Sequence, residues 1–172
     1  IGEHNKKNIM AARLVAKEIG ISEDEIRETV KDFSGLAHRL EFVGEFNGIK
    51  YYNDSISTIP EATINAIESL KDVDTVIIGG LDRGIHYDNF ATYLTNSNVR
   101  NIILAYDTGK RIYIKMNPNR AILVNDLEEA VKRAKEVTEK GKVCLLSPAA
   151  ASYGYFKNFE ERGNKFKELI KK

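Results

Sequence analysis

The fold is decided by the segment VDTVIIGGLDRG, residues 73–84. Its first half, 73–78, is a short, mostly apolar run rich in β-branched residues, which predicts a buried strand. Similar runs occur at 99–106, 121–124 and 142–146, and stretches with helical periodicity separate them. Strands that alternate with helices at this spacing predict an α/β fold with a doubly wound, mostly parallel, Rossmann-like sheet.

The remaining elements of this unit are predicted from local signals. Asn47-Gly48 stands between two alternating runs, 40–46 and 49–53. Both turn positions of Asn-Gly favour positive φ, so a β-hairpin is expected at the start of the sheet. Amphipathic patterns, one of them opened by a proline, predict helices at 60–70, 87–94, 109–116, 127–140 and 160–171.

Two helices are predicted before the hairpin. Apolar residues recur at helical spacing over 6–19, and Ser22 with Glu25 forms a capping-box pattern that starts a second helix ending near Phe33. We expect a boundary at Ser34, which divides the chain into units of 1–34 and 35–172. Because the sequence starts at Ile1 and not at a methionine, we expect a piece of a longer polypeptide.

Composition narrows the functional class. The chain of 172 residues carries 26 Lys and Arg against 25 Asp and Glu, a net charge of +1, so no global field favours nucleic acid or an anionic membrane. No apolar run approaches the ~18 residues of a membrane span. Cys144 is the only cysteine, which excludes an intramolecular disulfide and fits a reducing, cytoplasmic location.

Ligands of doubly wound sheets lie beyond the carboxyl ends of the strands, and four loops there carry polar or small residues. In 53–60, Asp54 can accept from hydroxyls, while Ser57 and Thr58 favour an anion near a helix start. Ordinary N-capping is the equally weighted alternative.

In the loop 79–84, the glycines permit close approach and Arg83 is a forked donor for a carboxylate or phosphate. The alternative there is a solvated turn with a surface pair between Asp82 and Arg83. The loop 106–109 is interpreted as an ordinary turn and helix cap.

The small residues of 147–154 predict accessible backbone N–H groups that bind an anion. The alternative is a tight loop that packs under the sheet. We favour binding because small residues are concentrated there and a helix follows.

Several kinds of site are excluded by spacing. The sequence has no Cys/His pairing typical of a metal site, no Ser-His-Asp arrangement with a nucleophile elbow and no Walker A loop. His4, His38 and His86 receive no individual role, because a lone histidine is more often structural. No catalytic residue and no metal ligand are therefore assigned to this chain.

Six motifs in order resemble those of the Mur ligase family, over essentially the whole chain. They are Gly2-Glu3-His4-Asn5-Lys6-Lys7-Asn8, His38-Arg39-Leu40-Glu41, Asn53-Asp54-Ser55 with Thr58, Gly79-Gly80-Leu81-Asp82-Arg83-Gly84, Leu145-Leu146-Ser147-Pro148-Ala149-Ala150-Ala151-Ser152 and Phe156-Lys157-Asn158-Phe159-Glu160-Glu161-Arg162-Gly163. The Asn-Asp-Ser form is similar to that of the branch that adds D-glutamate. Three positions depart from the family pattern: Ile56 and Arg83 each replace a usual lysine, and Ala150 replaces a usual cysteine.

The resemblance implies an enzyme that uses ATP and Mg²⁺ to convert the carboxylate of UDP-N-acetylmuramoyl-L-alanine into an acyl phosphate, which the amine of D-glutamate attacks. Residues 1–34 would be the helical end of the central ATPase domain, and 35–172 would be the amino-acid-binding domain. The groups that handle phosphate and metal would lie in the absent part. The chain alone is therefore expected to be inactive and to bind no cofactor tightly.

The resemblance also implies residue roles. Asn5 would contact adenine, Arg39 the ATP phosphates or ribose, and Asp54 the ribose hydroxyls. The α-carboxylate of D-glutamate would meet Ser152 and the backbone N–H of Phe159. Its side-chain carboxylate would meet the two residues Thr58 and Arg83.

Two alternatives stay open. The first is another Mur-type or folylpolyglutamate-type amide ligase with a different amino acid. The second is a stand-alone α/β module that binds a nucleotide or an amino acid.

Overall fold

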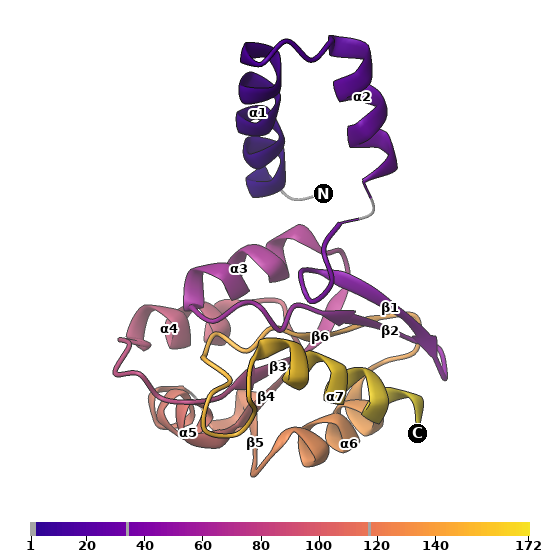
Figure 1. Ribbon diagram of the computed structural model, residues 1–172. Helices are drawn as coiled ribbons and strands as arrows, with labels where there is room; N and C mark the ends of the chain where they lie inside the picture. The colour runs from indigo at the N-terminus through magenta and orange to yellow at the C-terminus, as the bar shows by residue number, and fades with distance from the viewer. Residues whose placement is uncertain (1–2, 34, 117) are drawn as a thin grey trace.

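The computed structural model describes residues 3–33, 35–116 and 118–172 and contains one six-stranded sheet (Figure 1). Strand β1 pairs antiparallel with β2, and every other pairing is parallel. The order is β1-β2-β6-β3-β4-β5, which confirms the predicted doubly wound α/β fold. The strands are β1 (Glu41–Phe46), β2 (Ile49–Asn53), β3 (Val73–Gly79), β4 (Asn101–Ala105), β5 (Ala121–Val124) and β6 (Val143–Leu146).

Helices cover both faces of the sheet. One face carries α3 (Pro60–Ser69), α4 (Asp88–Asn96) and α5 (Tyr106–Lys115); the other carries α6 (Leu127–Val137) and α7 (Phe159–Lys171). The strands alternate between two cores, because successive side chains point to opposite faces. In β3, Val76 and Ile78 face α3–α5, while Ile77 faces α6 and α7. Both faces are apolar, so the strand sequences read as continuous hydrophobic runs.

The hairpin forms at the predicted turn. Asn47 and Gly48 have φ values of 55° and 81°, both positive as the two-residue turn requires. This hairpin makes β1 the antiparallel edge and places β2 beside β6. It therefore brings the end of β2 next to the middle of the sheet.

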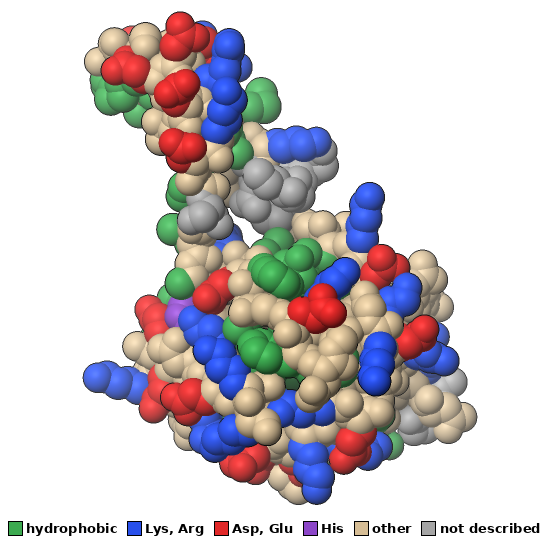
Figure 2. All heavy atoms as spheres, turned by 90° about the vertical axis from the view of Figure 1, so that its right-hand side faces the viewer, with side chains coloured by type: hydrophobic (Ala, Val, Ile, Leu, Met, Phe, Trp, Pro, Cys, Tyr) green, Lys and Arg blue, Asp and Glu red, His purple; other side chains and the backbone are tan. Residues whose placement is uncertain are grey.

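Helices α1 (Glu3–Glu18) and α2 (Glu23–Asp32) pack on each other and form an arm that projects from the body (Figures 1 and 2). The predicted capping box is present: Ser22 Oγ accepts from Glu25 N, and the Glu25 carboxylate accepts from Ser22 N. Hydrophobic side chains lie exposed on the arm, as Figure 2 shows. They are Met10, Leu14, Val15, Ile19, Ile21, Val30 and Phe33. Within the described ranges, no helix is long and apolar enough to cross a membrane.

Several predicted element boundaries differ from the structure by a few residues, and two of the differences involve tertiary contacts. The turn expected at 106–109 is the first turn of α5, which begins directly at Tyr106 with φ of 61°. Gly109 lets this turn sit against β4, since a Cβ there would lie 2.8 Å from the Leu104 carbonyl carbon. Helix α6 ends at Val137, three residues early: Thr138 adopts an extended conformation, and its hydroxyl lies 2.7 Å from Thr75 Oγ1 on β3.

Candidate functional site at the carboxyl edge of the sheet

Three loops meet where β2, β6 and β3 end. Two backbone hydrogen bonds join the loops after β3 and β6: Gly79 N donates to Pro148 O and Leu81 N to Ala151 O, each at 2.8 Å. Asp54 N, just past β2, donates to Leu146 O at the end of β6. Central strands of a doubly wound sheet end at the crevice where ligands bind, so the fold places these loops at the expected position for a site.

Asp54 lies inside this junction and is 2% exposed. One carboxylate oxygen accepts from the hydroxyls of Ser57 (2.5 Å) and Ser147 (2.8 Å), and the other accepts from Leu40 N (3.2 Å). Burial raises the pKa of Asp54, against these donors and the nearby charge of Arg39, which lower it. Asp54 therefore ties together the ends of β2 and β6 and the segment before β1.

The residues Ser57 and Thr58 do not cap α3. Its N-cap is Ile59, which makes no side-chain capping bond, and the Ser57 hydroxyl is committed to Asp54. Thr58 is partly exposed, and its carbonyl accepts from Arg83 Nη2 at 2.8 Å. The structure thus brings together two residues, Thr58 and Arg83, that were predicted to hold one end of the amino acid.

The loop after β3 is shaped by its neighbours. The pair predicted as an alternative between Asp82 and Arg83 is not formed; Asp82 contacts Arg111 on α5, and Arg83 is exposed at the edge of the site. The glycines fit against the protein backbone: a Cβ at Gly79 would lie 1.9 Å from Ala105 O, and one at Gly80 would lie 2.3 Å from Ala151 O.

The loop after β6 is buried from Ser147 to Ser152. Its carbonyls accept from protein donors, including Tyr87 Oη to Ala149 O at 3.1 Å. Residues 147–151 therefore form a tightly packed loop, which was the alternative to an anion-binding loop. The chain turns outward after Ser152, with Tyr153 exposed, and returns at Phe159 to start α7.

Arg162 holds the beginning of α7 against the other loops and is 1% exposed. Its Nε donates to Ser55 Oγ (3.0 Å), its Nη1 to Ala150 O (3.1 Å) and its Nη2 to Ser55 O (2.8 Å). Ser55 Oγ in turn donates to Phe159 O at 2.8 Å. Burial lowers the pKa of Arg162 to about 10, and none of the described carboxylates forms an ion pair with it.

The remaining predicted site residues differ in how exposed they are. Arg39 is exposed, and the adjacent Leu40 N–H contacts Asp54, so two of the predicted nucleotide contacts lie together. Ser152 is 3% exposed and Phe159 is half-buried. The side chain of Asn5 lies outside the described residues.

Sequence reasoning missed two arginines, Arg111 and Arg162. Arg162 belongs to the motif Phe156 to Gly163, in which only Phe159 was given a role. Its place in that motif could have indicated that it is important. No comparable signal marked Arg111, because its role depends on where α5 packs.

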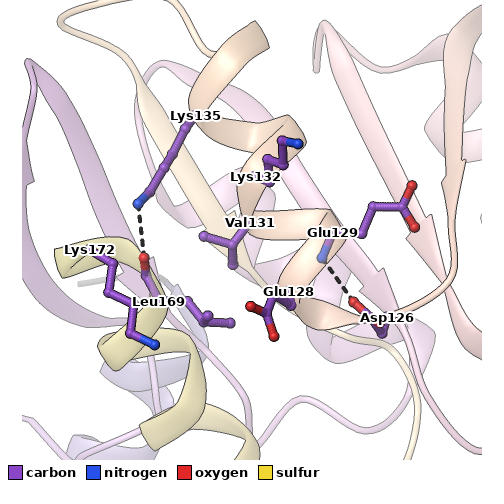
Figure 3. A pocket seen from close by; sticks show the side chains of 8 residues that line it. All are labelled: Asp126, Glu128, Glu129, Val131, Lys132, Lys135, Leu169 and Lys172. Atoms are coloured by element: carbon purple, nitrogen blue, oxygen red, sulfur yellow. Dashed lines mark hydrogen bonds between the residues drawn. The ribbon is translucent and has the colours of Figure 1, made fainter.

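The two clearest hollows lie away from these loops. One, of about 440 Å³, lies between α6 and α7 and is lined mainly by charged residues such as Glu128, Lys132 and Lys135 (Figure 3). The other, of about 580 Å³, lies at the amino ends of the strands near Asp72 and Asp74. Neither is lined by a predicted site residue. In the described part of the chain, no group of three or more His, Cys, Asp or Glu residues is placed to hold a metal.

Comparisons with known proteins identify the family. The model of the "Mur ligase, glutamate ligase domain" matches residues 38–150. UDP-N-acetylmuramoylalanine–D-glutamate ligase of Caldanaerobacter subterraneus subsp. tengcongensis is 48% identical over 174 residues, covering 98% of this chain and 38% of that protein. The enzyme of the same name from Aquifex aeolicus is 39% identical, covering 98% of this chain and 41% of its own length. The chain thus spans well under half the length of these relatives.

Solved structures show the same fold at low identity. MurF from Acinetobacter baumannii superposes with a TM-score of 0.76 at 14% identity, covering 99% of this chain and 38% of that one. MurF ligase from Thermotoga maritima in complex with ADP gives 0.70 at 19%, with 99% and 39% coverage. The match of the family model to residues 38–150, on a sheet and loops of this arrangement, shows that the chain belongs to the Mur ligase family.

Proposed function

We propose that this chain is the amino-acid-binding, C-terminal part of an ATP-dependent ligase that joins D-glutamate to UDP-N-acetylmuramoyl-L-alanine in peptidoglycan synthesis. The relatives named for this reaction support the proposal. The observation that carries it is the meeting of the loops after β2, β3 and β6 with the start of α7 at the carboxyl edge of the sheet. This edge carries one pair of predicted ligands, Thr58 and Arg83, and a second pair, Ser152 and Phe159.

The electrostatics of this edge suit a dianionic amino acid. Arg83 presents an exposed guanidinium, which binds a carboxylate through charge-assisted hydrogen bonds. Phe159 is the first residue of α7, and its N–H has no acceptor among the described residues. Free N–H groups at a helix start favour an anion. The buried charge of Arg162 lies behind them without a carboxylate partner and adds to this positive field.

We place the nucleotide on the side of Arg39, Asp54 and Asn5. Arg39 is exposed and free to reach a phosphate. Asp54 Oδ1 accepts one hydrogen bond, from Leu40 N, and has a second lone pair; because Asp54 is 2% exposed, a ribose hydroxyl would reach it only after the Arg39–Leu40 segment moves. In the complete cytoplasmic enzyme, ATP would phosphorylate the precursor's carboxylate and the amine of D-glutamate would displace the phosphate. Mg²⁺ would be held by the part of the enzyme that precedes this chain.

Residues 1–34 belong, in this proposal, to the end of the ATPase domain. The exposed apolar side chains of the arm, such as Leu14 and Phe33, support this assignment because such surfaces normally pack against a partner. The arm would therefore be covered by the rest of that domain in the complete enzyme.

The test uses the full-length enzyme and steady-state kinetics. Arg83→Ala is expected to raise the KM for D-glutamate at least tenfold, since a charge-assisted hydrogen bond contributes about 1.5–3 kcal/mol. The KM for ATP should change less than about twofold. Arg100→Ala is the matched control, because the side chain of Arg100 forms an exposed ion pair with Glu139 at the opposite edge of the sheet and, among the described residues, no other ion pair or hydrogen bond. Equal, small effects on both KM values would contradict the role of Arg83.

Substrate competition separates the remaining ligase candidates. The full-length enzyme is offered D-glutamate, L-glutamate, L-alanine and a diamino acid at equal concentration, and the products are resolved by mass spectrometry and chiral chromatography. We expect D-glutamate to be incorporated. Preferential incorporation of another amino acid would overturn the substrate assignment and leave the family membership intact.

A further inference from the structure

We propose that Arg111 is a positioning residue that sets the affinity for the amino-acid substrate by shaping the loop that carries Arg83. This inference rests on the proposed function. Arg111 lies on α5, outside every motif of the loops, and in the described part of the chain its hydrogen bonds go to Asp82 and Ile85, not to the predicted ligands of the amino acid. It acts through Asp82 and through the backbone of the loop.

Arg111 makes three contacts with this loop. Its Nη1 donates to the Asp82 carboxylate, and its Nη2 donates to Ile85 O at 3.2 Å. Its guanidinium carbon lies 5.7 Å from the centroid of the Tyr87 ring, within the range of a cation–π contact. One side chain thereby fixes points on both sides of Arg83.

Asp82 is the link between this clamp and the turn. The same Asp82 oxygen accepts from Gly84 N at 2.9 Å, closing a turn around Arg83. Gly84 has φ of 75°, so the turn uses a conformation that other residues rarely adopt. Arg83, at the centre of the turn, points away from Asp82 and donates to Thr58 O. The turn geometry therefore directs Arg83 toward its partner in the site.

Charge gives Arg111 a second effect. Asp82 is adjacent in sequence to Arg83, and its side chain is 28% exposed. Without Arg111, this carboxylate is free to pair with Arg83 or to repel an incoming carboxylate, since opposite and like charges act over several ångströms at partly buried sites. Arg111 neutralises Asp82 and leaves the charge of Arg83 available.

The clamp is anchored in the core. Tyr87 is fully buried, and its hydroxyl donates to Ala149 O in the loop after β6. The contact between Arg111 and Tyr87 thus connects the loop of Arg83 to the loop that leads to Ser152. Among the described residues, the side chain of Arg111 contacts Asp82, Ile85 and Tyr87 and forms no hydrogen bond or ion pair with Arg39 or Asp54. We therefore expect a change at Arg111 to act mainly on the loop that carries Arg83.

The experiment measures kcat and both KM values for full-length variants at position 111. Arg111→Ala is expected to raise the KM for D-glutamate tenfold or more while the KM for ATP stays within twofold. Arg111→Lys keeps a charge for Asp82 and is expected to restore part of the loss. Arg133→Ala is the control: Arg133 forms an exposed ion pair with Glu136 on α6, and we expect no change.

A double substitution tests the mechanism. If Arg111 acts by neutralising the charge of Asp82, removal of that charge should compensate for the loss of Arg111. The double variant Asp82→Asn with Arg111→Ala should then have a lower KM for D-glutamate than Arg111→Ala alone. A purely structural role would lower the melting temperature and kcat and would leave the KM ratio unchanged. That outcome, or equal shifts of both KM values, would overturn the inference.

Arg83→Ala in the same assay separates the two proposals. If Arg83→Ala raises the KM for D-glutamate and Arg111→Ala does not, only the role of Arg111 fails. If neither variant changes this KM, the assignment of the amino-acid site fails with it.

Discussion

His38 shows how a single buried residue joins three elements. It is 6% exposed, and its φ of 63° places it at the bend between the arm and β1. Asn53 Oδ1 accepts from Ser55 N, and Asn53 Nδ2 donates to Glu41, so the amide orientation is fixed. Asn53 Nδ2 lies 2.9 Å from His38 Nδ1, which must therefore be the acceptor of a neutral ring. The ring also packs edge-on against Phe159, at 6.0 Å between centroids.

This arrangement predicts a loss of stability in mild acid. Burial and then the charge of Lys167 lower the pKa of His38, while Glu41 and Glu160 oppose the shift. The pKa of His38 in the folded state lies below its unfolded value of about 6.5. The stabilisation that neutral His38 provides is therefore fully present above that pH and is lost as the pH falls. Urea unfolding at pH 7.5 and 5.5 should give a lower free energy of unfolding at pH 5.5.

Substitutions at two histidines, one buried and one exposed, test this prediction. His38→Asn suits the positive φ and cannot titrate, so it should reduce the pH dependence. His86→Asn changes an exposed residue and should leave the dependence as it is. An unchanged pH dependence in His38→Asn would show that other groups cause it.

At the scale of elements, helix α7 is docked through a glycine. A Cβ at Gly163 would lie 2.2 Å from His38 Nδ1 and 2.9 Å from Asn53 Nδ2. Glycine weakens a helix interior by roughly 0.5–1 kcal/mol relative to alanine. Here that cost is offset, because only glycine lets α7 approach the His38–Asn53 pair closely enough to place Phe159 and Arg162 in the site.

We therefore expect Gly163→Ala to destabilise the chain by about 1–3 kcal/mol, as overpacking of a tight contact does. The effect is opposite in sign to the gain expected from helix propensity. Asn164→Ala, at the exposed neighbouring position of the same helix, should be neutral or slightly stabilising. Chemical denaturation of the two variants tests the comparison, and equal stability of both would refute close docking at Gly163.

At the scale of the whole molecule, the chain consists of a packed body and a projecting arm. The two cores lie on the two faces of the sheet, and all their members come from the body. The strongest contacts of α1 and α2 are with each other. Stability should accordingly reside in residues 35–172.

Removal of the arm tests this division. A chain of residues 35–172 is expected to melt within about 3 °C of the full chain, since a change of 1 kcal/mol shifts the midpoint by roughly 2–4 °C at this size. Binding of the dye ANS should fall, because the exposed apolar residues of the arm are lost. Leu14→Lys in the full chain should lower dye binding in the same direction. A large fall in melting temperature would mean that the arm supports the body.

The elements were predictable where the signal is local. The Asn47-Gly48 turn, the capping box at Ser22 and the apolar run at 73–78 each act within a few residues. Element ends were less predictable because distant groups set them: Thr138 leaves α6 for a contact with Thr75 on β3. The same holds for the candidate site. The positions of its loops could be predicted from strand ends and motif order, but the contacts within and between the loops could not.

The doubly wound sheet, the hairpin, the four strand-end loops and membership in the family could be predicted from the amino-acid sequence, because periodicity, turn chemistry and motif order are properties of the chain. The pairing of the charges became visible only in the folded structure. Asp82 pairs with Arg111, Arg83 reaches Thr58, and Arg162 is buried among carbonyls and a hydroxyl without an acid. These contacts join residues that are distant in the sequence, and burial, which no local pattern encodes, determines their strength.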